Sequence, residues 1–138
     1  MSQAPFAYAE PANDRAGLAL SLSLFADRAH LRDLLREDAQ AAGFRIAAAA
    51  GLAELLEGAA RPLGDVVLVD CPEAGGAELA ALSRLDVRAA NTGAQLVVST
   101  SVAALDDVFA CLDQSGAQIL VDPSRAERVI ALGRVLAD

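Results

Sequence analysis

Three aspartates in the sequence each follow a short apolar run and stand directly before a break in regular structure. Asp70 ends the run at 66–69, and Asp27 and Asp122 follow similar runs nearer the two ends of the chain. A run of this kind is typical of a buried strand that delivers one acidic side chain to the carboxyl edge of a sheet. In open parallel α/β sheets, ligands and chemistry lie at this edge. Three carboxylates that meet there would offer oxygen ligands to a hard cation such as Mg²⁺.

Hydroxyl side chains follow another predicted strand, at 95–98. Ser99, Thr100 and Ser101 form a cluster there, and such residues commonly cap the start of a helix. We expect capping from Thr100 and Ser101. Asp27 also stands before a helical pattern, so a capping role and a metal-binding role both stay open for it.

One cation lies beside these carboxylates in the sequence. Arg28 follows Asp27 directly, and the chain contains no lysine, so its 11 basic residues other than histidine are all arginines. Two roles are consistent with Arg28. It can act as a guanidinium that neutralises Asp70, or it can be an ordinary solvated arginine on the surface.

The elements that would position these side chains alternate along the chain. Strand patterns occur at 18–25, 44–50, 66–70, 95–98 and 119–121, and apolar residues at helical spacing follow each one. Five βα units in succession require a parallel sheet with helices on both faces, because each crossover is right-handed. We therefore predict an α/β fold, a flavodoxin-like three-layer α/β/α sandwich with five parallel strands in the order 2-1-3-4-5.

Local signals mark where several of the helices begin and end. Gly43 is expected to stop the first helix, and Gly116 to lie just after the fourth, whose apolar stripe runs from 102 to 112. Ser124 and Glu127 have the spacing of a capping box, so the last helix is expected to open there.

Composition limits the classes of protein that fit the chain. Its 138 residues are 54% hydrophobic, enough for one domain with a substantial core, placed at 18–138 after a flexible arm at 1–17. The chain has a net charge of -8, whereas a surface that binds nucleic acid is typically rich in basic residues. Cys71 and Cys111 are expected to be buried small apolar residues rather than a disulfide framework. We recognise neither a signal peptide nor a membrane-spanning run, and expect a cytoplasmic location.

The motifs resemble those of the receiver (CheY-like) domains of bacterial response regulators, over nearly the whole chain after the first 17 residues. In that family the third strand ends on a phosphoacceptor aspartate. The LVD of 68–70 matches this strand and puts Asp70 in the acceptor position. The LRDLL of 31–35 aligns with the family's first helix, which puts Asp27 on the second acid of the first strand and Ala26 on the first.

Two further motifs continue the resemblance. The family's hydroxyl position, at the end of the fourth strand, falls on Thr100 or Ser101. The LVDP of 120–123 matches the lysine-proline motif of the fifth strand, with Asp122 where the lysine should be. Ile119 stands where many receivers carry an aromatic residue that switches conformation.

The positions that depart from the family pattern are ones that the resemblance assigns to phosphoryl transfer. In the family, the first-strand acids and the acceptor hold Mg²⁺, and the lysine pairs with the phosphoryl group. Because phosphoryl transfer depends on positioning and charge stabilisation, loss of one acid and of the lysine removes much of what the site supplies. A carboxylate at Asp122 would also repel a phosphorylated Asp70, by on the order of a few kcal/mol at an effective dielectric constant near 20.

The resemblance therefore predicts a degenerate receiver, or pseudo-receiver, that signals by binding and is not an enzyme. Asp70 would be a vestigial acceptor beside an acidic pocket of Asp27 and Asp122. We expect no cofactor, protein partners that include a second copy of the chain, and no direct contact with nucleic acid or membrane. The expected setting is the N-terminal regulatory domain of a bacterial transcription regulator in a two-component system.

Two alternatives stay open. One is a working phosphoacceptor that uses Asp70, with Arg28 or Mg²⁺ at Asp27 and Asp70 replacing the lost charge. The other is a sensor domain that binds a small ligand in the crevice at the strand ends.

Overall fold

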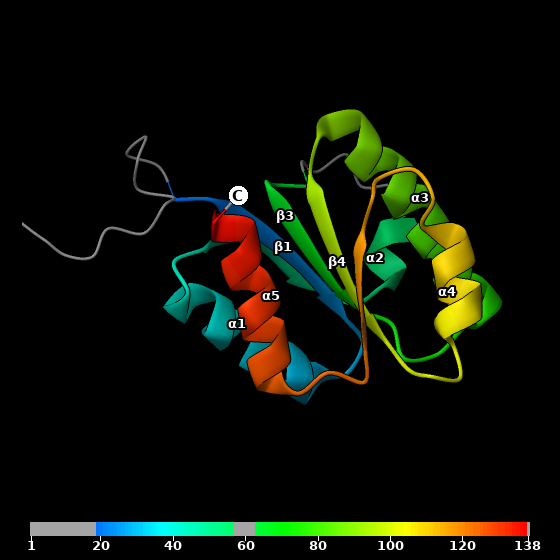
Figure 1. The fold of residues 1–138 in the computed structure, drawn as a ribbon, viewed down its shortest axis with the longest axis horizontal. Helices are drawn as coiled ribbons and strands as arrows, with labels where there is room; N and C mark the ends of the chain where they lie inside the picture. The colour runs from blue at the N-terminus through cyan, green and yellow to red at the C-terminus, as the bar shows by residue number, and fades with distance from the viewer. Residues whose placement is uncertain (1–18, 57–62, 138) are drawn as a thin grey trace, which may run out of the picture.

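The fold is a three-layer α/β/α sandwich built on one parallel sheet (Figure 1). The computed structural model describes residues 19–56 and 63–137. Five strands form the sheet in the order β2-β1-β3-β4-β5, as predicted. They are β1 (Ser21–Ala26), β2 (Arg45–Ala50), β3 (Val66–Asp70), β4 (Gln95–Thr100) and β5 (Gln118–Val121). Because all pairings are parallel, the carboxyl ends of the five strands share one edge.

Helices cover both faces of the sheet (Figure 1). On one face lie α1 (Ala29–Ala41) and α5 (Arg125–Ala137), and on the other lie α2 (Ala53–Leu56), α3 (Gly76–Thr92) and α4 (Leu105–Cys111). The sheet consequently separates two hydrophobic cores. The core under α1 and α5 includes Leu35, Leu68 and Leu132, and the opposite core includes Val69, Leu82 and Val108.

The central strands are buried on both sides because helices cover both faces. All six residues of β1 and all five of β3 are buried. Alternate residues of each strand therefore enter different cores, as Leu68 and Val69 do. Because of this alternation, side chains at the strand ends can contact one another only when they lie on the same face of the sheet.

Several local predictions can be compared directly with the structure. The capping box at α5 is confirmed, because the Ser124 amide donates to Glu127 Oε1 at 2.8 Å and the Glu127 amide donates to Ser124 Oγ at 3.1 Å. Gly43 follows α1 with φ of 103°, a left-handed conformation that favours glycine and ends the helix.

The prediction that the fourth helix starts at 102 is wrong, because 102–104 form a turn and α4 begins at Leu105. Val102 and Phe109, two members of the expected buried stripe, are 71% and 67% exposed. The helix buries Val108 instead, since a short helix presents only a narrow face to the sheet.

Two predictions fall on parts of the chain outside the described ranges. The flexible arm expected at 1–17 lies wholly outside them, and so does the start of the strand expected at 18–25. Within the described ranges, no helix is both long and apolar enough to cross a bilayer.

Candidate functional site

Asp70 lies at the carboxyl edge of the sheet, between two neighbouring strands. It is the last residue of β3 and is in register with Ala26 of β1 and Ser99 of β4. Its side chain is only 2% exposed. A carboxylate buried to this extent needs compensating hydrogen bonds or charges.

Arg28 supplies the first and closest compensation. Its Nε donates to Asp70 Oδ2 at 2.9 Å, and its Nη2 lies 2.9 Å from Oδ1 and 2.8 Å from Oδ2. Both carboxylate oxygens are therefore engaged by one guanidinium, in the forked geometry that arginine forms best. Arg28 stands at the N-cap of α1 in an extended conformation, and its side chain remains 55% exposed.

Arg128 supplies a second cation, from α5. This arginine is buried, and its Nη2 lies 3.5 Å from Asp70 Oδ1 and 3.5 Å from Ser99 Oγ. Its Nη1 donates to the Pro123 carbonyl at 3.2 Å. Burial lowers the pKa of the Arg128 guanidinium, while the charge of Asp70 acts in the opposite direction. Asp70 thus ties α5 to the edge of the sheet.

The sequence analysis missed Arg128, although a signal for it was present. Arg128 stands three, four and seven positions before Ala131, Leu132 and Val135, which form the buried stripe of α5. An arginine on the buried face of a helix needs an anion nearby. Its partner could therefore have been sought among the three strand-end carboxylates, Asp27, Asp70 and Asp122.

The hydroxyl that contacts Asp70 belongs to Ser99, whereas the resemblance pointed to Thr100 or Ser101. Ser99 Oγ donates to Asp70 Oδ1 at 3.0 Å. Thr100 is buried and its hydroxyl has no hydrogen-bond partner within the described residues. Ser101 Oγ donates to the Pro72 carbonyl at 2.8 Å and accepts from the Ala104 amide at 3.2 Å, so it caps the turn before α4. The register of β3 against β4 explains this, because it pairs Asp70 with Ser99.

Asp27 accepts a hydrogen bond from a backbone amide, but this amide lies before α2 and not at the start of α1, the helix that Asp27 precedes. Its Oδ1 accepts from the Leu52 amide at 2.9 Å, just before α2. The Cβ of any residue replacing Gly51 would lie 2.8 Å from the same oxygen, so this close approach depends on the glycine. Asp27 therefore joins the ends of β1 and β2 through this oxygen.

Asp122 turns away from the other two aspartates. Its φ of 44° is a left-handed conformation, and its Oδ2 lies 3.4 Å from the Val102 amide, which donates to it. The side chain is exposed and contributes nothing to the lining of the pocket beside Asp70. The predicted acidic pocket of Asp27, Asp70 and Asp122 is therefore not formed, because Asp122 lies outside it.

The residues around Asp70 do not fit Mg²⁺. A pocket of about 170 Å³ lies beside Asp70, lined by Asp27, Arg28, Leu52, Asp70, Pro72, Glu73 and Glu78. A guanidinium occupies both oxygens of Asp70, Ala26 stands in the position of the first acid, and one Asp27 oxygen is bound to backbone. Across 19–56 and 63–137, no three acidic, histidine or cysteine side chains are grouped so that they could hold a metal ion.

Cys71, the neighbour of Asp70, is buried and faces the opposite core. Its thiol donates to the Glu73 carbonyl at 3.3 Å. Burial, reinforced by the negative charges of Glu78 and Asp70, raises the pKa of the Cys71 thiol to about 11. The expectation of a buried cysteine is confirmed for Cys71, whereas Cys111 is only partly buried.

Comparison with known proteins identifies the fold. No family model and no curated protein sequence matches the chain. Among solved structures, NtrX from Brucella abortus is similar over 86% of this chain, with 16% identity and a TM-score of 0.66. The signal receiver domain of a putative LuxO repressor protein from Vibrio parahaemolyticus is 16% identical, with a TM-score of 0.63, and that of the putative response regulator NarL from Mycobacterium tuberculosis is 19% identical, with 0.62.

This chain covers very different fractions of these three solved structures. The chain spans 27% of the NtrX structure, but 90% of the LuxO receiver domain and 97% of the NarL receiver domain. It therefore has the fold of a response-regulator receiver domain, as the sequence motifs predicted, and corresponds in extent to one such domain.

Proposed function

We propose that the chain is a receiver-like signalling module that works by binding other proteins and does not depend on phosphorylation. The observation that carries this proposal is the forked contact of Arg28 with both oxygens of Asp70, at 2.8–2.9 Å. In the receiver family an oxygen at this position attacks the phosphoryl group. Here the same oxygens are already hydrogen-bonded to a cation of this chain.

The electrostatic balance at the edge supports the proposal. Asp70 carries one negative charge and lies near two guanidinium groups, one of them on the buried side chain of Arg128. Phosphoryl transfer needs a free nucleophile and a charge clamp for the incoming group, usually a metal ion. Arg28 and Arg128 stabilise the carboxylate itself, which lowers its nucleophilicity, and the surroundings do not suit Mg²⁺.

The arginines would also hold the domain in one signalling state. Arg28 would neutralise Asp70 and so imitate the activated state of a receiver permanently. Arg128 would transmit this state to α5, because the same guanidinium contacts Asp70, Ser99 and the Pro123 carbonyl. We assign the chain to the regulatory part of a cytoplasmic transcription regulator, which is supported by the likeness to the receiver domain of a putative repressor.

The proposed partner is a second copy of the chain, through the surface formed by α4, β5 and α5. Exposed apolar side chains gather on these elements and on the turn before α4: Val102, Phe109, Val121, Val129 and Ile130. Sedimentation velocity on the purified chain should show a dimer that Ile130→Glu weakens and Val87→Glu, at an exposed site on α3, leaves intact. A monomer at all concentrations, or equal loss in both variants, would contradict this assignment.

Thermal unfolding with Mg²⁺ and beryllofluoride, a mimic of the acyl phosphate, tests the proposed function. We expect the same Tm with and without the two ions, because binding to the folded chain alone would raise it. Asp70→Asn is the control. A rise in Tm that Asp70→Asn abolishes would overturn the proposal in favour of a working acceptor.

A further inference from the structure

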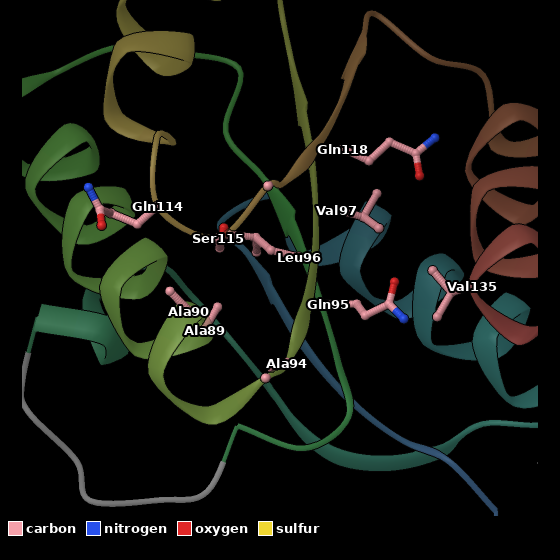
Figure 2. Close-up of a pocket in the computed structure, with 12 residues that line it drawn as sticks. Ala89, Ala90, Ala94, Gln95, Leu96, Val97, Gln114, Ser115, Gln118 and Val135 are labelled. Atoms are coloured by element: carbon pink, nitrogen blue, oxygen red, sulfur yellow. The ribbon is translucent and has the colours of Figure 1, made fainter. Parts of the chain in front are cut away.

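A larger pocket lies at the opposite, amino edge of the sheet (Figure 2). It has a volume of about 420 Å³, compared with about 170 Å³ for the pocket beside Asp70. Small-molecule sites are typically about 300–1,000 Å³, so of these two pockets the amino-edge one reaches this size and the one beside Asp70 does not. It lies between the C-terminal end of α3, the start of β4, the loop after α4 and the last turns of α5.

The pocket exists because β5 is shorter than β4 at this edge. Pairing between the two strands starts at Val97 and Gln118, so β5 leaves the first two residues of β4 unpaired on that side. In Figure 2 the side chains of Gln95, Val97 and Gln118 all point to the side where Val135 of α5 lies. The end of the sheet is thereby left open.

A buried carboxylate holds one wall of the pocket in place. Asp86 of α3 is 1% exposed and accepts from the Gln114 amide at 2.8 Å, the Ser115 amide at 3.0 Å and the Ser115 hydroxyl at 2.6 Å. Gln114 and Ser115 belong to the lining. The loop after α4 is therefore held against α3 by three hydrogen bonds to a buried carboxylate, and we infer that this wall of the pocket is preformed.

The lining carries amides but no ionisable side chain. Twelve residues line the pocket: Ala89, Ala90, Gly93, Ala94, Gln95, Leu96, Val97, Gln114, Ser115, Gly116, Gln118 and Val135. Within the described part of the chain, the side-chain amides of Gln95 and Gln118 make no hydrogen bond, which leaves donors and acceptors available to a ligand.

From this juxtaposition we propose that the amino-edge pocket binds a small uncharged molecule that carries a primary amide. The amides of Gln95 and Gln118 can each donate to and accept from such a group, while Val97 and Val135 contact its apolar part. A carboxylate ligand finds no cation in the lining and meets a chain of net charge -8. The proposal is independent of the state of Asp70, at the other edge.

Protein-observed NMR with nicotinamide and propionamide, each compared with its acid, tests the proposal. We expect both amides to shift the backbone signals of Gly93, Gly116 and Gln118, and nicotinic and propionic acids to bind at least about tenfold more weakly. Ala90→Leu fills part of the pocket from an exposed position on α3, and should weaken amide binding about tenfold. Ala80→Leu, an exposed position on the same helix outside the pocket, should leave it unchanged.

Three results would overturn the proposal. One is the absence of shifts with either amide. Another is that the acids bind as tightly as the amides, or that Ala90→Leu binds the amides as tightly as the unaltered chain does. The third is shifts confined to Arg28 and Asp70, which would place amide binding at the carboxyl edge. None of these results depends on whether Asp70 accepts a phosphoryl group.

Discussion

One buried aspartate lies at the carboxyl edge of the sheet and another lies on α3 near the amino edge, and the two carboxylates have different kinds of partner. Asp70, at the carboxyl edge, is bound by the guanidinium of Arg28 and the hydroxyl of Ser99, with Arg128 nearby. Asp86, near the amino edge, is bound by backbone amides and one hydroxyl of a single loop. Both side chains are almost fully excluded from water.

This difference decides what each aspartate controls. Charged partners make Asp70 part of a network in which removal of one member leaves another charge without compensation. Neutral partners make Asp86 a local anchor, since the amides released by its loss can turn to water. The first arrangement engages both oxygens of Asp70 with a cation of the same chain, and the second holds a loop that lines the amino-edge pocket.

The largest expected effect is that of Asp70→Ala. This change leaves the buried Arg128 without its anion, and breaking a buried ion pair typically costs about 3–5 kcal/mol. Urea unfolding should show a loss of that order in the free energy of unfolding. Adding Arg128→Met to Asp70→Ala should recover much of it, and a double variant as unstable as the sum of the two single variants would contradict a shared network.

A smaller loss is expected from Asp86→Ala, about 1–3 kcal/mol, because only neutral donors lose their acceptor. Hydrogen exchange should show faster exchange at the Gln114 and Ser115 amides, with little change at Arg28. Asp106→Ala, at an exposed position in the first turn of α4, serves as control. Unchanged exchange at Gln114 and Ser115 would show that Asp86 does not hold the loop.

Arg28→Ala is expected to cost less again, about 1 kcal/mol or below, despite the short distances. Its side chain is 55% exposed, so water and salt screen the pair, and Asp70 keeps Arg128 and Ser99. Urea unfolding at low and high salt should show a small loss that shrinks as the salt concentration rises. A loss as large as that of Asp70→Ala would make Arg28, and not Arg128, the main partner.

The fold was predictable from the sequence because each unit carries its own local signal. The apolar run before Asp70 and the capping box at Ser124 and Glu127 both depend on neighbours in the chain. Asp70 was found for the same reason.

The partners of Asp70 were harder to predict because they come from other elements. Which of Ser99, Thr100 and Ser101 meets Asp70 depends on the register of β4 against β3, which no single strand encodes. Arg128 reaches the site from α5 because of how that helix packs on the sheet. Arg28 was considered from its place beside Asp27, but only the structure shows its forked contact.

The remaining effect is confined to alkaline pH and concerns Cys71, whose thiol pKa is raised first by burial and then by the negative charges of Glu78 and Asp70. Its pKa is raised from 9.0 to about 11 in the folded chain. The unfolded chain therefore loses this proton first, so the contribution to stability is complete below pH 9 and is lost as the pH rises toward 11. Tm should fall more between pH 9 and 11 than it does for Cys71→Ala. An identical fall in both would contradict the raised pKa.

In the proposed function, Arg28 and Arg128 hold Asp70 in a state that does not take up a phosphoryl group. Intact-mass spectrometry after incubation with Mg²⁺ and acetyl phosphate can detect such uptake, with Asp70→Asn measured alongside. We predict the same mass before and after incubation for the unaltered chain. A phosphoryl adduct that Asp70→Asn abolishes would contradict the proposed function, and would show that Asp70 remains a working acceptor.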